Sequence, residues 1–247
     1  MSWFENSCAE RVVPWRWGVT LFHSEYPKVY MLNFVRVEGA PPDLNFDELV
    51  AEADALHAQV GLVHRGIVIE DARLGAALAP AFRRNEWEVS TLVLMAYRDE
   101  RELPDTGRDV REITSDELRA IRAHSYSVGP SAKDPETVRQ MIDKDAHLAR
   151  AGGARFFGAV VDDQTVCSAD LYSDGATAQI ESVLTLEPFR KRGLGRAVVA
   201  EAIRAAFDSG HDFVFLLADD EDWPRELYAR MGFEPLGRCY DFLKAPD

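Results

Sequence analysis

The order of the predicted elements is the sequence feature that most limits the fold. In the second half of the chain, apolar runs and helical periodicity predict a strand, a helix, a strand, a short helix and a strand. These elements span Ala178–Leu186, Leu194–Asp208, Asp212–Ala218, Pro224–Met231 and Phe233–Leu243. Such alternation favours parallel strand pairing across each crossover, with the helices packed on the sheet. The sequence therefore predicts an α/β fold with a mixed sheet.

The first half predicts the same order of elements, at Val29–Val37, Asp47–Gln59, His64–Ile69, Arg73–Arg84 and Val89–Tyr97. The polar stretch Asp99–Asp109 lies between the halves and is typical of a linker, which divides the chain into domains 1–103 and 108–247. The ends of the two halves also align without gaps, with residues 82–87 (FRRNEW) against residues 228–233 (YARMGF). This alignment favours an internal duplication over two unrelated halves that share a common layout.

The charge distribution excludes some classes of partner. The 247 residues carry a net charge of −14, and residues 108–247 hold 18 basic and 25 acidic residues. Because no basic tail or stripe is present, neither nucleic acid nor an anionic membrane is an expected partner. A small cationic acceptor fits the negative field, although the same charge also serves solubility alone.

The apolar runs and the cysteines indicate a cytoplasmic protein without a metal site. Runs such as Phe213–Ala218 are too short to cross a bilayer, and Met1–Trp17 has no secretory signal pattern. The three cysteines, Cys8, Cys167 and Cys239, have no metal-ligand spacing, and their odd number argues against a disulfide framework.

The strongest chemical signal is the run from Val183 to Arg196, in which a strand enters a basic, glycine-containing turn that opens a helix. The first amides of a helix have no acceptors within it, and together with the helix dipole they form a site for phosphate groups. Gly193 and Gly195 leave room for such a ligand to approach the backbone. The run has no Gly-Lys-Ser/Thr and no third glycine at dinucleotide-fold spacing, which excludes those two phosphate-binding loops.

Arg190, Gly193 and Gly195 resemble the Arg/Gln-x-x-Gly-x-Gly/Ala motif with which GNAT N-acetyltransferases bind acetyl-CoA. Further along, Leu227–Phe233 resembles the Leu-Tyr-x-x-x-Gly-Phe segment of the same family. Two ordered motifs on the expected frame identify the second half as a complete GNAT domain. One departure is Glu221, which stands where many members of the family carry an asparagine.

The resemblance implies how acetyl-CoA binds and reacts. A bulge would open the sheet so that the pantetheine arm pairs with Val183, Leu184 and Thr185. The pyrophosphate would bind at the turn that is formed by Arg190, Lys191, Arg192, Gly193, Leu194, Gly195 and Arg196. An amine would then attack the thioester directly, without a covalent enzyme intermediate.

The catalytic candidates follow from the same resemblance. Tyr228 matches the general acid of the family, although a tyrosine there could also only pack against the cofactor arm. Glu181 lies on the strand that often carries a carboxylate base, and its alternative is a solvated or salt-bridged strand residue. The acids of Asp219–Asp222 could attract a cationic amine or cap the next helix. Tyr126 is a candidate for the wall of the acceptor pocket, whereas His124 and His147 fit surface or packing roles.

The first half has lost the features of this motif. Its junction, Val37–Asp43, has no Arg-x-x-Gly-x-Gly and contains two prolines, which remove amide donors. Phe82 stands at the position of Tyr228, and Glu86 stands at that of Gly232. We therefore expect a degenerate GNAT-like copy that does not bind acetyl-CoA, but supports the second half, forms part of the acceptor pocket or mediates homodimerisation.

The sequence thus predicts an acyltransferase that transfers the acetyl group of acetyl-CoA to a primary amine. A small molecule is the first choice of acceptor, and a protein N-terminus or lysine is the second. The alternatives are a non-catalytic acyl-CoA sensor, against which Tyr228 argues, and a protein whose two halves serve only interactions.

Overall fold

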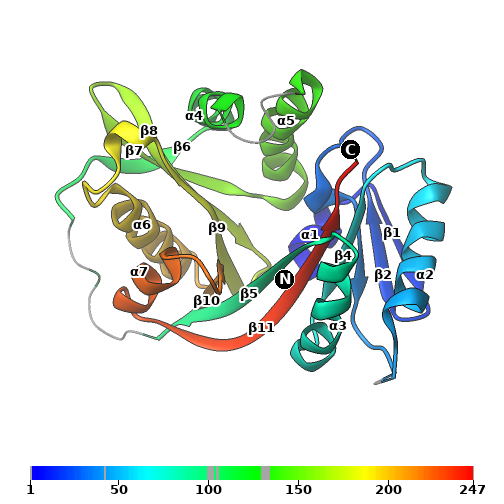
Figure 1. The fold of residues 1–247 in the computed structure, drawn as a ribbon. Helices are drawn as coiled ribbons and strands as arrows, with labels where there is room; N and C mark the ends of the chain where they lie inside the picture. Colours follow the sequence, from blue (N-terminus) through cyan, green and yellow to red (C-terminus); the bar gives the residue numbers. More distant parts are fainter. Residues whose placement is uncertain (1, 42, 99–102, 104–105, 129–133, 247) are drawn as a thin grey trace. The chain divides into compact units, whose positions relative to one another are not determined.

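The computed structural model describes all residues except 1, 42, 99–102, 104–105, 129–133 and 247. The chain forms two compact units (Figure 1). The C-terminal unit consists of Met1–Cys8, Met95–Leu217 and Glu226–Glu234. The N-terminal unit consists of Ala9–Leu94, Ala218–Arg225 and Pro235–Asp247. Most of the predicted linker, Asp99–Asp109, falls outside the described residues.

The units are not contiguous in sequence, which differs from the predicted boundaries 1–103 and 108–247. Helix α1 (Ser2–Cys8) belongs to the C-terminal unit, and most of strand β11 (Phe233–Lys244) belongs to the N-terminal unit. The expectation that Phe233–Leu243 closes the second half is wrong, because β11 pairs antiparallel with β4 (Arg65–Ile69). The physical reason is packing, since Phe242 stacks on the core residue Phe82 at 4.0 Å between ring centroids.

The C-terminal unit has a mixed sheet, as the sequence predicts. Its strands are β6 (Val110–Ile113), β7 (Arg155–Val161), β8 (Gln164–Ser173), β9 (Thr177–Thr185) and β10 (Phe213–Asp219), and their order is β10-β9-β8-β7-β6. Neighbouring strands run antiparallel from β6 to β9, whereas β9 and β10 are parallel. The parallel pair is the one joined by a helical crossover, α6 (Leu194–Asp208).

Helices pack on both sides of this sheet (Figure 1). Helix α6 packs on β7, β8 and β9 through the predicted apolar face, of which Val198, Val199, Ala202, Ile203 and Ala206 are buried. Phe207 was expected on that face too, but its exposed fraction is 43%. On the other side, α4 (Ser115–Val128) packs on β8, α5 (Pro135–Gly152) packs on α4, and α1 packs on α5. The short helix α7 spans Pro224–Arg230.

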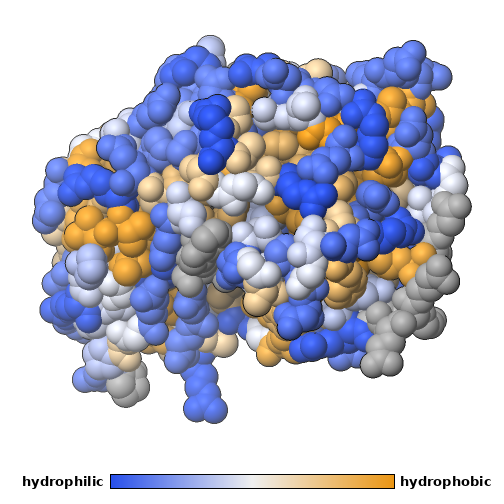
Figure 2. All heavy atoms as spheres, turned by 180° about the vertical axis from the view of Figure 1, so that it is seen from behind, coloured by the Kyte–Doolittle hydropathy of each residue, from blue (hydrophilic) through white to orange (hydrophobic). Residues whose placement is uncertain are grey.

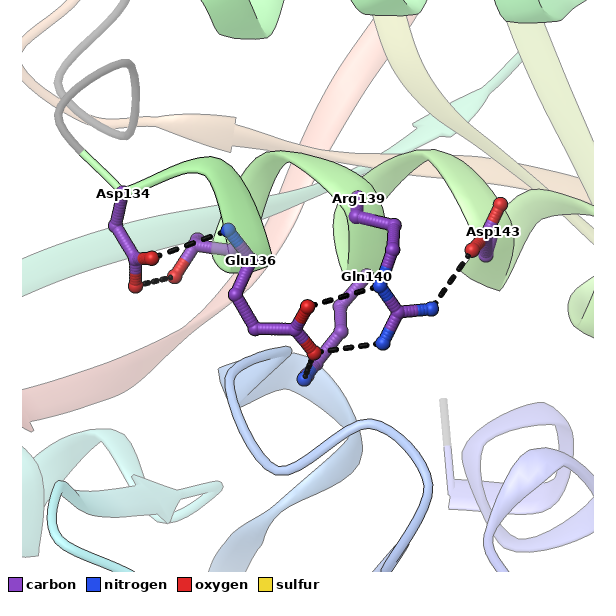
Figure 3. Close-up of polar contacts among 6 residues, drawn as sticks. Asp134, Glu136, Arg139, Gln140 and Asp143 are labelled. Carbon is purple, nitrogen blue, oxygen red and sulfur yellow. Dashed lines mark hydrogen bonds and ion pairs between the residues drawn. The ribbon is translucent and has the colours of Figure 1, made fainter.

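Helix α5 is fixed at its start by its own polar side chains (Figure 3). The carboxylate of Asp134 accepts a hydrogen bond from the Glu136 amide at 3.1 Å, which caps the helix. Further along, Arg139 donates to Glu136 and to Asp143, and the Asp143 carboxylate also pairs with Arg119 of α4 at 2.9 Å. These contacts hold α4 and α5 together on the side of the sheet that carries α1.

The N-terminal unit contains β1 (Arg11–Trp15), β2 (Gly18–Phe22), β3 (Phe34–Val37), α2 (Phe46–Gln59), β4, α3 (Ala72–Arg84) and most of β5 (Glu88–Tyr97). The strand order is β1-β2-β3-β4-β11, and β3 and β4 pair in parallel, as expected for strands joined by a helix. The predicted strand Val29–Val37 begins only at Phe34, because Tyr30–Leu32 forms a 3₁₀ turn. The hairpin of β1 and β2 was not predicted.

The face drawn in Figure 2 is mostly hydrophilic, with separate hydrophobic areas. The exposed large apolar side chains, such as Val63, Trp223 and Leu236, are scattered along the chain, in agreement with the high net charge. Within the described part of the chain, no helix combines the length and the apolar character that a membrane span requires.

Candidate functional site

Strand β9 carries a bulge immediately after Glu181. Asp170 of β8 faces Glu181 and Ser168 faces Leu184, so two residues, Ser182 and Val183, lie opposite one. Ser182 adopts a positive φ of 53°, as a bulged residue can. The bulge was predicted near Val183–Thr185, and the structure places it at the start of that segment.

The bulge coincides with the end of the pairing between β9 and β10. Parallel pairing runs from Thr177 opposite Phe213 to Ile180 opposite Leu216, whereas β9 continues to Thr185. The backbone of β9 beyond Ile180 therefore leaves its neighbour and presents an edge with which an extended ligand can pair as an added strand. Val183, Leu184 and Thr185, which are predicted to contact the pantetheine arm, thus lie on the part of β9 that is not paired with β10.

The turn after β9 presents backbone amides at the start of α6. Lys191 and Gly193 adopt left-handed conformations, with φ of 61° and 81°. Gly193 is the N-cap residue of α6, and with no side chain it cannot cap the first-turn amides itself. The first-turn amides and the positive end of the helix dipole are therefore left uncapped by a side chain at this turn, where they would stabilise an anion.

A glycine stands at each of the two motif positions, 193 and 195, for a different physical reason. Gly193 is required by its positive φ, although a Cβ there would meet no atom within 4 Å. At Gly195 a Cβ would meet only the Thr185 hydroxyl, at an ordinary 3.7 Å, so neither packing nor backbone conformation demands a glycine. A glycine at that position would allow a ligand to approach the helix start closely.

The basic side chains of the turn lie on its exposed surface. Arg190 donates from Nε to the Thr185 carbonyl at 3.2 Å, which ties the turn to the end of β9. Arg192 donates to the Pro188 carbonyl at 3.1 Å and lies over the ring of Phe189. Lys191 and Arg196 are exposed as well. The turn therefore combines fixed amides with a local excess of positive charge.

Glu181 lies half-buried at the opening of the sheet. Its Oε1 accepts a hydrogen bond from Gln179 Nε2 at 2.5 Å. Burial raises the pKa of the Glu181 carboxyl to about 7; the Gln179 hydrogen bond opposes that rise, and the charges of Asp170 and Glu5 add to it. A carboxylate with a pKa near neutrality suits a general base, since it can both accept and release a proton at physiological pH.

A buried ionic cluster supports the strand that faces Glu181. Asp170 accepts a hydrogen bond from Arg122 of α4 at 2.7 Å, and Arg122 also lies 3.6 Å from Asp145 of α5. Lys144 donates to Asp145 at 2.6 Å, and all four side chains are buried. Sequence reasoning missed this cluster. The available signal was that Arg122 and Lys144 lie on the apolar faces of α4 and α5.

Tyr228 is buried on α7, with an exposed fraction of 8%, and its ring lies edge-on to that of Phe233 at 6.0 Å between centroids. It belongs to the same unit as β9 and the turn. Its role as general acid stays a prediction, as do the roles of the other site residues.

Three further side chains that the sequence singles out make contacts within the protein. Asp220 forms ion pairs with Arg225 and Arg238, and the segment Ala218–Arg225 belongs to the N-terminal unit. His147 hydrogen-bonds through Nε2 to the Cys8 carbonyl at 2.7 Å, which agrees with a packing role. Cys167 is buried in the sheet, 3.1 Å from the Thr185 hydroxyl.

The C-terminal unit is thus an α/β domain whose mixed sheet opens at a bulge, next to an amide-lined turn at a helix start. Residues 115–233 match the family model described as "Acetyltransferase (GNAT) family". The chain therefore contains a GNAT acetyltransferase domain, as its motifs predict.

Solved structures show the same fold over nearly the whole chain. A functionally unknown conserved protein from Staphylococcus epidermidis is 17% identical, with 96% of this chain and 94% of that chain covered and a TM-score of 0.75. A GCN5-related N-acetyltransferase from Kribbella flavida is 20% identical, with coverage of 97% and 91% and a TM-score of 0.61. No curated protein sequence matches the chain.

A third similar structure is a tandem GNAT protein from the clavulanic acid biosynthesis pathway. It is 16% identical, with 86% of this chain and 75% of that chain covered and a TM-score of 0.55. At these identities the likeness establishes the fold, which is mixed α/β in both halves.

Proposed function

We propose that the protein is an acetyl-CoA-dependent N-acetyltransferase that acetylates a primary amine of a small molecule. The observation that carries this proposal is the coincidence of three features within a few residues of β9. Pairing with β10 ends at Ile180, Glu181 follows with a pKa raised to about 7, and the bulge begins at Ser182. The opened strand offers a binding edge, and the carboxylate offers a base at the same point.

Strand β9 and the turn after it would bind two different parts of acetyl-CoA. The backbone of Val183, Leu184 and Thr185 would pair with the pantetheine arm, and the amides of residues 191–196 would bind the pyrophosphate. Arg190 and Lys191 would add charge toward the phosphates. Acetyl-CoA supplies an activated thioester, and the amides beside the bulge would polarise its carbonyl.

The chemistry then needs three proton transfers. Glu181 would take a proton from the acceptor ammonium, directly or through a water, so that the neutral amine attacks the thioester carbonyl. A C–N bond forms, the C–S bond breaks, and Tyr228 would give its phenolic proton to the departing thiolate. The attacking nitrogen would then lose its extra proton to the Tyr228 phenolate, which leaves a neutral amide. Both residues act as acid–base groups, and no covalent bond to the protein is needed.

The N-terminal half is proposed to be a degenerate copy that does not bind acetyl-CoA. At the corresponding helix start, the side chain of Asn45 caps α2 by accepting from the Glu48 amide at 3.0 Å. Asp47 and Glu48 add negative charge in the first turn, where a pyrophosphate would be repelled.

Two measurements test this function. Calorimetric titration with acetyl-CoA should show one binding event per chain, and a panel of primary amines should release free thiol in the presence of acetyl-CoA. Glu181→Gln should retain acetyl-CoA binding and lose most thiol release. Binding without release for every amine, including peptide and lysine acceptors, would contradict the enzyme and favour an acyl-CoA sensor.

A further inference from the structure

Helix α1, at the start of the chain, is built into the face of the C-terminal unit that carries Glu181. The ring of Phe4 stacks on that of Tyr172 in β8, with 3.8 Å between centroids and 4° between planes. A Cβ on Gly152 would lie 2.5 Å from the ring of Phe4 and 2.7 Å from the Cys8 sulfur. The close approach of α1 to α5 therefore requires a glycine at 152, and the position of Phe4 is fixed.

Phe4 borders a small hollow next to the proposed base. The hollow is lined by Phe4, Tyr172, Gln179, Phe215 and residues of the turn between β8 and β9. Gln179 joins the hollow to the base, because its side-chain amide donates to Glu181 at 2.5 Å. Tyr172 and Asp170 stand opposite Gln179 and Glu181 on β8, so these four side chains share one face of the sheet.

The chemistry of the hollow suits a small ammonium compound. Its walls include three aromatic rings, which attract a cation and cover an apolar body, next to polar side chains of the turn and of Gln179. The carboxylate of Asp174 lines the hollow at the turn, and the charge of Glu5, which follows Phe4 in the sequence, acts on Glu181. The charge of Asp170 is balanced by Arg122, whereas the side-chain partner of Glu181 is the neutral amide of Gln179, so an ammonium acceptor would meet a carboxylate that no cation neutralises in these contacts.

We propose that Phe4 is a specificity-determining residue, which fills the acceptor side of the hollow and restricts the enzyme to small primary ammonium acceptors. This inference rests on the proposed function of Glu181 and Tyr228. The ring of Phe4 is 6% exposed and occupies the space beside Gln179 into which the body of a larger amine would extend. The N-terminal helix thereby takes part in substrate selection although it lies far from the site in sequence.

Replacement of Phe4 by a smaller side chain tests this role. Ethylamine and phenethylamine serve as probes, and calorimetry measures their binding to the protein saturated with CoA, alongside thiol release with acetyl-CoA. Phe4→Ala opens room for about one phenyl ring, so the ratio of kcat/KM for phenethylamine to that for ethylamine should rise about tenfold or more. Phe4→Leu keeps α1 packed on α5 and should shift the ratio in the same direction by less.

Phe207→Ala is the matched control, because it removes the same ring from the same unit on the opposite side of the sheet. It should leave the ratio unchanged, and acetyl-CoA affinity should be unchanged in all variants. An unaltered ratio in both Phe4 variants, or no binding of either amine to any form, would overturn the inference. If the binding ratio shifts but no amine is acetylated, the proposed function fails while the role of Phe4 in the hollow stands.

Discussion

Helices α6 and α2 each follow the first strand of a parallel pair, but they begin in different ways. Helix α6 begins after Gly193, which has a φ of 81° and no side chain, in a turn that carries three consecutive basic residues. Helix α2 begins after Asn45, whose side chain occupies the Glu48 amide. The same order of elements therefore serves two different purposes. Amides left to a ligand make a binding site, and amides capped by the protein stabilise a helix.

The aligned segments near the ends of the two halves share a backbone turn but differ at the aromatic position. Residues 82–87 and 228–233 align in sequence, and the structure adds that Glu86 and Gly232 both adopt positive φ, of 60° and 97°. The shared left-handed turn supports the proposed duplication. At the aligned aromatic position, Phe82 is fully buried against Phe46, Trp87 and Phe242, whereas Tyr228 keeps a hydroxyl. A position that could give a proton in one half holds the core together in the other.

The largest effect is expected for the hydroxyl that distinguishes Tyr228 from Phe82. Tyr228→Phe makes the C-terminal half resemble the N-terminal half and should lower kcat by about 10²–10⁴-fold, because the departing thiolate loses its proton donor. The dissociation constant for acetyl-CoA should remain within about twofold. Steady-state kinetics and calorimetry measure the two quantities.

Tyr97→Phe is a suitable control, since it removes a hydroxyl from another buried tyrosine of the same unit. Equal losses of kcat in both variants would show that Tyr228 acts through packing.

The helix starts can be compared through one substitution in each half. Gly193→Asp places a carboxylate where the pyrophosphate should bind and should weaken acetyl-CoA binding by about 100-fold or more. Gly193→Ala introduces only the strain of the positive φ, so its effect should be clearly smaller.

The matched change in the N-terminal half is Gly39→Asp, at the junction after β3, where a Cβ would meet nothing within 4 Å. Calorimetry should show unchanged acetyl-CoA binding for this variant. If Gly39→Asp weakened binding as much as Gly193→Asp, the N-terminal half would have to be a second cofactor site.

The pKa of Glu181 gives the next smaller effect. Since its raised value is about 7, the carboxyl is protonated below that pH and cannot accept the proton of the ammonium. We therefore expect kcat/KM for the amine to fall by about tenfold for each pH unit below 7. Glu181→Gln should remove this inflection from the pH profile, while an inflection that persists in the variant would assign it to another group.

The sequence was sufficient for elements with strong local signals. Helix α6 has the predicted bounds, because the glycine at each end and its apolar periodicity are local properties. The strand exchange of β11 was not predictable, since its partner, β4, is chosen by long-range packing of Phe242. In the site, the turn follows from a motif. The hollow was missed because Phe4 reaches it from the other end of the chain.

The smallest effect concerns the shared left-handed turn. Glu86 is exposed, adopts a φ of 60°, and its carboxylate lies 3.9 Å from Lys244, a surface pair that contributes little. Glu86→Gly relieves the strain of a non-glycine residue in the left-handed region. The substitution also increases the entropy of the unfolded chain, which offsets part of this gain. The free energy of unfolding should therefore rise by about 0.5–1 kcal/mol. Urea denaturation measures the change.

Gly232→Glu, the reciprocal swap, should lower the free energy of unfolding by at least as much, because the φ of 97° at this position suits glycine alone. If the two substitutions change the free energy of unfolding in opposite directions, both halves keep the same left-handed turn. If Glu86→Gly is destabilising, the side chain of Glu86 has a role that the alignment does not explain.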